Sequence, residues 1–336
     1  MRMSNWLDWQ LIVTAVFIAC IALLGVTSGS DYLIQILVLA TIYAAVAASW
    51  SIAGGLGGLL LLGFISFYGV GAYTNGILLT KYGISPWINI FIAGGVAALL
   101  GWLIAAVTLR YELSEDYFAM FTVGVSQVLK VLLLNSDYFG RATGIYITIV
   151  EDNWLMMAFV SRKPYLLIAL ALLLAIVIVS YLIQRSKFGF RLAAVRQNSR
   201  AAEALGIDPV KTKIQAIIVA GGLGGSVGAF YSQFVTFIDP KQVFSLATNF
   251  EMLLGAVLGG RLTIIGPVLG AAALKPLQDV LRGIFGGEAD ALYLVLYGAL
   301  LIMSCLTLPK GIAFYIEQWH KRRYTSTPTS SKEGQQ

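Results

Sequence analysis

The residues most able to do chemistry begin in an apolar stretch, residues 117–134, where polar side chains recur at a helical spacing. Residues four apart share one face of a helix. Hydroxyl and amide groups on an apolar helix hydrogen-bond to neighbouring helices, and a lysine there faces a cavity, a partner or the membrane surface. Two interpretations stay open: polar contacts that join helices, or the polar lining of a path for a solute. The residues on or beside this face are Phe118, Thr122, Ser126, Gln127 and Lys130.

Two further polar residues, Asn249 and Glu251, stand near the start of a later apolar run. Charged groups inside a membrane pair with one another or mark a functional site. We therefore expect Asn249 and Glu251 to be partners of Lys130 and to belong to the same path.

A basic segment, residues 185–213, contains the pattern of a short helix with both ends marked. Asn198 or Ser199 can accept hydrogen bonds from the first free N–H groups, and the alanines at 201, 202 and 204 favour helix. Gly206 suits a left-handed ending, and Asp208-Pro209 can begin the next helix. A helix of about two turns is not stable alone. It must dock on this protein or on a partner, unless the segment is only a solvated basic loop.

Several kinds of site are excluded by the residues that the chain lacks. Its one histidine, His320, excludes a His-based metal cluster and a Ser-His-Asp triad. No Gly-Lys pair occurs, so the chain has no phosphate-binding loop of the G-x-x-x-x-G-K-[ST] type and cannot bind ATP by that route. We expect neither catalytic residues nor metal ligands. Cys20 and Cys305 lie in apolar runs and are expected to pack rather than to form a disulfide.

The elements that must position these residues are membrane helices. Of the 336 residues, 58% are hydrophobic and 12% are charged, and the mean hydropathy is +0.80. Soluble domains carry about 25% charged residues, so the composition excludes a soluble enzyme and disfavours a nucleic-acid-binding protein. We expect an all-α polytopic membrane protein. The apolar runs that are long enough to span are Leu11–Thr27, Leu33–Ala53, Leu59–Thr80, Trp87–Thr108, Tyr117–Leu134, Pro164–Gln184 and Ile214–Phe237.

Two apolar runs in the last third of the chain, Asn249–Leu258 and Ile264–Leu274, are short for a full crossing. They are expected to form either two tilted helices or a pair of half-helices. Lys275-Pro276 should then break the helix, because proline has no N–H to donate. The residues that follow should form an amphipathic helix. The charged face that we expect at the membrane surface consists of Lys275, Asp279 and Arg282.

With a last span at Ala291–Leu308, the chain is expected to cross the membrane about ten times. Both ends are placed inside, because most of the 23 Lys and Arg residues then lie on the cytoplasmic side. The hexapeptide Ala-Gly-Gly-Leu-Gly-Gly occurs at 53–58 and at 220–225, as a chance match in a glycine-rich chain or as a trace of two inverted five-helix halves. The expected organisation is a cytoplasmic N-terminus (1–10), a transmembrane domain (11–308) and a basic, partly disordered tail (309–336).

The short helix and several other motifs together resemble one family. Ala202-Glu203-Ala204 followed by Gly206 resembles the EAA loop of ABC importer permeases. More specifically, residues 35–310 resemble the high-affinity branched-chain amino-acid permease family of the LivM type. The motifs that carry this resemblance are Gly69-Val70-Gly71-Ala72-Tyr73-Thr74, Tyr117-Phe118-Ala119-Met120, Phe188-Gly189-Phe190-Arg191, Val195-Arg196-Gln197-Asn198, Ala201–Asp208, Leu258-Gly259-Gly260 and Gly266-Pro267-Val268-Leu269-Gly270-Ala271.

The resemblance implies a fold like that of type II ABC importers, in the bacterial inner membrane. Residues 198–206 would form a coupling helix that inserts into a separate ATPase subunit. The chain would bind no cofactor itself, since ATP-Mg is used by its partners. These partners would be a second, LivH-like permease, two ATPase subunits, an extracytoplasmic solute-binding protein and the lipid membrane, with no nucleic acid. The residues implied in ATPase coupling are Arg196, Asn198, Ala201, Ala202, Glu203, Ala204, Leu205 and Gly206.

The resemblance also points to a branched-chain or other hydrophobic amino acid as the solute, and related permeases carry urea or short amides. Family members usually have Gln, Ser and His before the Gly-Val-Gly motif, where this chain has Leu59, Leu61 and Phe64. This departure leaves the identity of the solute open. A more remote alternative is an ion-coupled secondary transporter, which should carry several buried acids or histidines.

Overall fold

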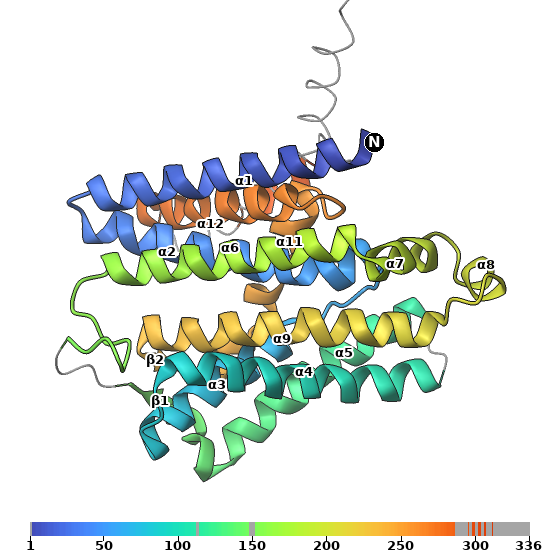
Figure 1. Cartoon of the computed structure of the whole chain (residues 1–336). Coiled ribbons are helices and arrows are strands. Elements are labelled where there is room, and N and C mark those ends of the chain that lie inside the picture. Colours follow the sequence, from blue (N-terminus) through green and yellow to red (C-terminus); the bar gives the residue numbers. More distant parts are fainter. Residues whose placement is uncertain are drawn as a thin grey trace, which may run out of the picture.

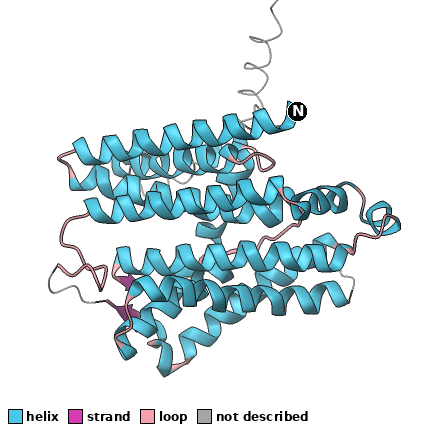
Figure 2. Cartoon of the chain, in the orientation of Figure 1, coloured by secondary structure: helices cyan, strands magenta, loops and turns pink. Residues whose placement is uncertain are grey.

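The computed structural model describes residues 2–111, 114–147 and 152–285, together with a few single positions between 295 and 311. The described chain is almost entirely helical (Figure 2). Long helices run side by side in a bundle, with the short helix of the basic segment at one end and a small pair of strands at the other (Figure 1). The expected all-α architecture is confirmed.

The long helices of the described chain are α1 (Arg2–Thr27), α2 (Asp31–Trp50), α3 (Ile65–Tyr82), α4 (Pro86–Arg110), α5 (Glu115–Asn135), α6 (Lys163–Arg185), α9 (Pro209–Val235), α11 (Leu246–Gly259) and α12 (Ile265–Phe285). The shorter elements are a π-helical turn (Ser51–Leu56), two 3-10 turns (Asp137–Phe139 and Arg141–Thr143), α7 (Lys187–Gln197), α8 (Ser199–Ala204) and α10 (Pro240–Val243). The strands β1 (Ile145–Tyr146) and β2 (Phe237–Ile238) pair antiparallel, with Ile145 opposite Ile238.

Several helices are long and apolar enough to cross a membrane. Within the described residues they number seven, and they include Pro240–Gly259, which joins α10 and α11. The chain is therefore a membrane-spanning protein, and ten crossings remain a prediction. The expected last span, Ala291–Leu308, and the tail 309–336 fall almost wholly outside the described residues. α1 is helical from Arg2 onward, so the segment that was expected to precede the first helix is part of it.

Small residues allow the helices to approach one another closely. α9 packs against α3 and α4, and α2 packs against α11 and α12. A side chain at Gly71 of α3 would collide with the backbone of Gly225 in α9, and one at Gly228 would collide with the backbone of Tyr68. Such contacts between small residues are the usual way in which membrane helices associate. Two other glycines of α3 are also closely packed: a side chain at Gly69 would collide with the ring of Phe244, and one at Gly76 would collide with Ile238 of β2.

Two expectations about helix boundaries are wrong. The run Leu59–Thr80 is not one helix, because α3 begins only at Ile65. Pro276 does not break the helix, since α12 continues through this residue from Ile265 to Phe285. A proline inside a membrane helix is tolerated where neighbouring groups satisfy the freed backbone. The two hexapeptide copies also differ: residues 53–58 form a π turn and its exit, whereas residues 220–225 lie within the straight helix α9.

Candidate functional site

The connection between α2 and α3 interrupts the bundle with non-helical backbone. The helix of α2 continues into the π turn at Ser51–Leu56, and residues 57–64 then run without regular structure to the start of α3. We call residues 57–64 the α2–α3 linker. Its side chains Leu59, Leu61 and Phe64 are all buried in the core. Irregular backbone at this depth occurs only where protein surrounds it or where it lines a cavity.

Side chains from three helices bind the backbone of the linker. Trp50 of α2 donates its indole N–H to the carbonyl of Leu61 at 2.9 Å. The hydroxyl of Thr122 in α5 accepts the N–H of Gly63 at 3.1 Å. Asn249 of α11 accepts the N–H of Ile65 at 3.0 Å and donates to the carbonyl of Leu62 at 2.5 Å. The linker is therefore stabilised by hydrogen bonds that would otherwise be made within a helix.

These contacts place the expected pathway residues. Phe118, Thr122 and Ser126 of α5 point into the protein and are buried, and the hydroxyl of Ser126 donates to the carbonyl of Val123 at 2.6 Å. Gln127 and Lys130 are half-buried. Among the described residues Lys130 forms no ion pair or hydrogen bond with Asn249 or Glu251, so the expected pairing is not formed. Asn249 instead hydrogen-bonds to the backbone at the end of the linker, and Glu251 accepts a hydrogen bond from Gln278 of α12.

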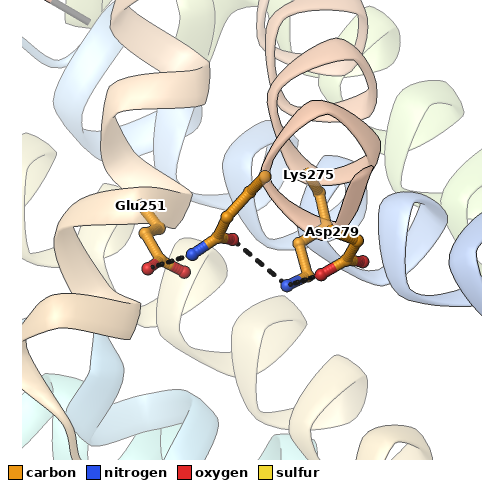
Figure 3. Close-up of polar contacts among 4 residues, drawn as sticks. Glu251, Lys275 and Asp279 are labelled. Atoms are coloured by element: carbon orange, nitrogen blue, oxygen red, sulfur yellow. Dashed lines mark hydrogen bonds and ion pairs between the residues drawn. The ribbon is translucent and has the colours of Figure 1, made fainter. Parts of the chain in front are cut away.

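Glu251 belongs to a cluster of charged and polar side chains between α11 and α12 (Figure 3). Gln278 donates to the Glu251 carboxylate at 2.6 Å. The Lys275 ammonium donates to the Gln278 carbonyl at 3.2 Å and lies 2.8 Å from Asp279 Oδ1. The ammonium also stands 5.0 Å from the centre of the Tyr43 ring in α2. The cluster therefore joins three helices.

The position of this cluster corrects the expected charged face. Side chains of Lys275 and Asp279 are only 12% and 18% exposed, so they lie inside the protein rather than at the membrane surface, whereas Arg282 is exposed. The sequence analysis missed Gln278. The signal was available in the spacing, because Lys275, Gln278 and Asp279 share one helix face with Arg282. Continuity of α12 through Pro276 is what keeps that face intact.

The short helix α8 has the ends that were expected. Asn198 accepts the N–H of Ala201 at 3.1 Å, Gly206 is left-handed with φ +81°, and the N–H of Ile207 returns to the carbonyl of Ala202 at 3.0 Å. Asp208 then accepts the N–H of Lys211 at 3.0 Å and begins α9. Hydrogen bonds from the backbone and side chain of Lys211 hold the pKa of Asp208 below its ordinary value.

Most of α8 is uncovered. It lies beyond the ends of the long helices, next to α7 and α9 (Figure 1). Its side chain at Ala202 is buried, whereas Ala201, Glu203 and Ala204 are exposed, and the Leu205 side chain that follows is 81% exposed. Exposed alanines and a leucine on a helix of this length leave a surface that the other described residues do not cover.

Arg196 connects the α8 region to the α2–α3 linker. Its guanidinium donates to the carbonyl of Gly55 at 3.3 Å, and its aliphatic stem lies directly against Gly58. Burial, together with the charge of Arg261, lowers the pKa of Arg196. A side chain at Gly55 would collide with the carbonyl of Arg261, so the turn before the linker packs against the α11–α12 connection. Arg196 thus points into the protein and not toward the exposed side of α8.

These features lie in one connected region of the described chain. Among the residues that the structure describes, no group of three or more His, Cys, Asp or Glu could hold a metal ion. What is present is an exposed helix, a buried arginine and an irregular segment inside the bundle. Contacts of Arg196 with Gly55 and Gly58 make these parts continuous from the end of the bundle to its interior.

Comparison with known proteins decides the family. The family described as "Branched-chain amino acid transport system / permease component" matches residues 32–305. The chain belongs to this family. It is 27% identical over 303 residues to the high-affinity branched-chain amino acid transport system permease protein LivM of Escherichia coli, covering 83% of this chain and 69% of LivM. It is also 26% identical to the nucleoside ABC transporter permease protein NupC of Lactococcus lactis, covering 76% of this chain and 86% of NupC.

A solved structure, PsaBC from Streptococcus pneumoniae in complex with Fab, is similar with a TM-score of 0.43 and 13% sequence identity, covering 86% of this chain and 96% of that chain. By the family match and the named relatives, this chain is an ABC transporter permease of the branched-chain amino-acid family, and those relatives are permease proteins of transport systems.

Proposed function

We propose that this permease imports a small solute by coupling to separate ATPase subunits through α8. The observation that carries the proposal is the exposure of α8, a capped helix whose Ala201, Glu203, Ala204 and Leu205 have no cover within the described chain. An ATPase subunit that binds this surface would complete the packing that so short a helix lacks. ATP-Mg would be bound and hydrolysed by that subunit, and the chain itself would bind no cofactor.

The remaining partners of the proposal would occupy other surfaces of the bundle. α5 contributes exposed apolar side chains, including Met120, Val128 and Val131, beside the half-buried Gln127 and Lys130. A second, LivH-like permease that covers this face would enclose a solute path with polar groups along it. An extracytoplasmic solute-binding protein would deliver the solute at the end of the bundle opposite α8. The chain would lie in the bacterial inner membrane with both termini in the cytoplasm.

The pattern of helix packing supports two inverted halves. α2 and α9 pack against each other, and each carries the equivalent set of neighbours: α11 and α12 on α2, and α3 and α4 on α9. An irregular segment follows each of these two helices and leads to a shorter helix, α3 or α11. Halves of five helices each, with the last one contributed by residues near 291–308, would give the expected ten crossings.

A branched-chain or other hydrophobic amino acid is the solute that we favour. The support comes from the family description and from LivM, which is named for branched-chain amino acids. NupC is named for nucleosides, so permeases of this kind serve more than one solute class. Urea or a short amide is the alternative. At Leu59, Leu61 and Phe64 the linker is apolar and buried, and it offers no polar side chain to a solute at these positions.

A test of the function uses the complex of this permease with its partner subunits in proteoliposomes. Glu203→Arg should abolish solute-stimulated ATP hydrolysis and lower ATP-driven uptake by about tenfold or more, because reversing a contact charge costs several kcal/mol. A matched control, Glu115→Arg, changes an exposed acid outside α8 and should leave both rates unchanged. If Glu203→Arg has no effect and uptake follows an ion gradient without nucleotide, the chain is a secondary transporter and the proposal is wrong.

A further inference from the structure

A cavity of about 680 Å³ lies at the end of the bundle opposite α8, between α2, α6, α9, α10 and α12. Its volume falls in the range of small-molecule binding sites, about 300–1,000 Å³. Much of its wall is aromatic, which suits the apolar part of a small molecule. The aromatic residues that line it are Tyr32, Tyr43, Phe159, Tyr165, Tyr231 and Phe234.

Charges of both signs also line the cavity. Arg162, Lys275 and Arg282 are the cations, and Asp279 is the anion. Arg162 is held in place, because its guanidinium donates to the Gln35 side chain at 2.6 Å. Arg282 is exposed and forms no ion pair with a described residue. Guanidinium groups bind carboxylates and phosphates through two parallel hydrogen bonds, so these two arginines fit an anionic group.

The anion has unused hydrogen-bonding capacity. Asp279 Oδ1 is paired with Lys275 at 2.8 Å, whereas Oδ2 is buried and has no hydrogen-bond partner among the described residues. Within the Figure 3 cluster one lysine stands beside two carboxylates, those of Glu251 and Asp279. An unpaired buried acceptor is costly, and a carboxylate is best satisfied by a cationic donor. Lys275 therefore satisfies one oxygen of Asp279, and the other oxygen has no donor among the described residues.

We propose that this cavity binds a small zwitterion, with the ammonium group held by Asp279 and the anionic group by Arg162 and Arg282. The inference rests on the proposed function only in treating the zwitterion as a solute of the transporter. An α-amino acid with an apolar side chain has this chemistry, and its side chain would lie against the aromatic wall. The aminoethyl phosphate headgroup of a lipid has the same pair of charges, so the experiment separates the two sources.

The experiment measures binding to the permease complex in nanodiscs of phosphatidylglycerol, without nucleotide and without the solute-binding protein. Leucine is titrated by calorimetry beside 3-methylbutylamine, which lacks the carboxylate, and 4-methylpentanoate, which lacks the ammonium group. Leucine should bind, and each analogue should bind at least about tenfold more weakly, since each loses one charged contact worth about 1.4 kcal/mol or more. Equal binding of all three would overturn the proposal.

Two variants and one control locate the site. Arg282→Gln changes an exposed residue that should not affect folding, and it should weaken leucine binding about tenfold; Asp279→Asn should do the same. Lys241→Gln removes an exposed charge of α10 that does not line the cavity, and it should leave binding unchanged. Failure of both Arg282→Gln and Asp279→Asn to weaken binding would overturn the proposal, whatever the affinity of the unchanged protein.

The lipid arm repeats the titration in nanodiscs that contain phosphatidylethanolamine. If the headgroup is the occupant, leucine binds weakly there, and phosphatidylethanolamine stays with the purified complex but is lost from the Arg282→Gln and Asp279→Asn variants. Absence of both leucine and lipid binding at these residues would refute the cavity site. The proposed function is judged separately, because Glu203→Arg should abolish ATP-driven uptake and leave leucine binding intact.

Discussion

The α2–α3 linker and helix α8 are both short segments that depart from the long-helix pattern, but their surroundings are opposite. The linker has no regular structure, yet Trp50, Thr122 and Asn249 satisfy its backbone from outside. α8 is regular and satisfies its own ends through Asn198 and Gly206, yet most of its side chains are uncovered. Arg196 connects the two regions. The contrast is that the linker is completed within this chain, whereas α8 is left uncovered by the described residues, as the proposed ATPase contact requires.

The largest expected effect comes from removing the linker's polar support. Asn249→Leu has a similar size but leaves the N–H of Ile65 and the carbonyl of Leu62 without partners, at about 1–3 kcal/mol each. We expect the detergent-solubilised permease to lose several degrees or more of thermal stability and to lose transport with it. Melting followed by circular dichroism, together with ATP-driven uptake, measures both effects.

Asn135→Leu is the matched control for this prediction, because Asn135 is at the exposed end of α5 and, among the described residues, its amide donates only to the carbonyl of Val131. It should change stability little. If Asn249→Leu were as stable as the unchanged protein, the linker would not depend on outside support, and the contrast with α8 would fail.

The sequence predicts these two regions unequally, and the reason is physical. The ends of α8 are set by Asn198, Gly206 and Asp208 within a few residues, so local rules recover them. The sequence of the linker predicts a helix, because Leu59–Leu62 is an apolar run. Side chains of α5 and α11, which are distant in sequence, instead hold the linker in a non-helical conformation. The three glycines at 57, 58 and 63 were the local signal that a helix is disfavoured there.

For the polar residues, too, the local spacing was predictable from the sequence and the distant partners were not. The shared face of Thr122 and Ser126 was predictable from their spacing, but the group that Thr122 binds, the backbone of Gly63, was not. Likewise, Lys130 and Glu251 were paired by their charge alone. The structure instead gives Glu251 to Gln278, because α11 and α12 pack against each other and bring these side chains into contact.

A smaller effect is expected from cutting the connection between the two regions. Arg196→Ala removes the hydrogen bond to Gly55 and the stem that packs on Gly58, without touching the exposed side of α8. We expect the complex to assemble and hydrolyse ATP, but to move several-fold less solute per ATP, because displacement of α8 no longer reaches the linker. Uptake and hydrolysis are measured on the same proteoliposomes.

Arg196→Lys is the informative comparison, since it keeps the charge and most of the stem but loses the planar guanidinium. It should restore part of the ratio of solute moved to ATP hydrolysed. Equal ratios in Arg196→Ala and the unchanged protein would show that α8 acts on the bundle by another route. A loss of ATPase assembly would show instead that Arg196 contacts the partner directly.

The smallest effect concerns the end of α8, where Asp208 begins α9. Hydrogen bonds from Lys211 lower the pKa of Asp208 in the folded protein below its ordinary value. The cap is therefore fully present above the unfolded-state pKa, about 3.9, and is lost as the pH falls through the lower folded-state value. Amide hydrogen exchange at residues 210–212, corrected for the intrinsic rate, should show reduced protection only in that acidic window. Asp208→Asn keeps an accepting oxygen without titrating, so the protection of these amides should not change with pH in that variant.

The contrast with the linker predicts that the amides of Gly63 and Ile65 stay protected throughout this pH range, because the neutral side chains of Thr122 and Asn249 accept from them. If both regions lost protection in parallel, they would unfold as one unit.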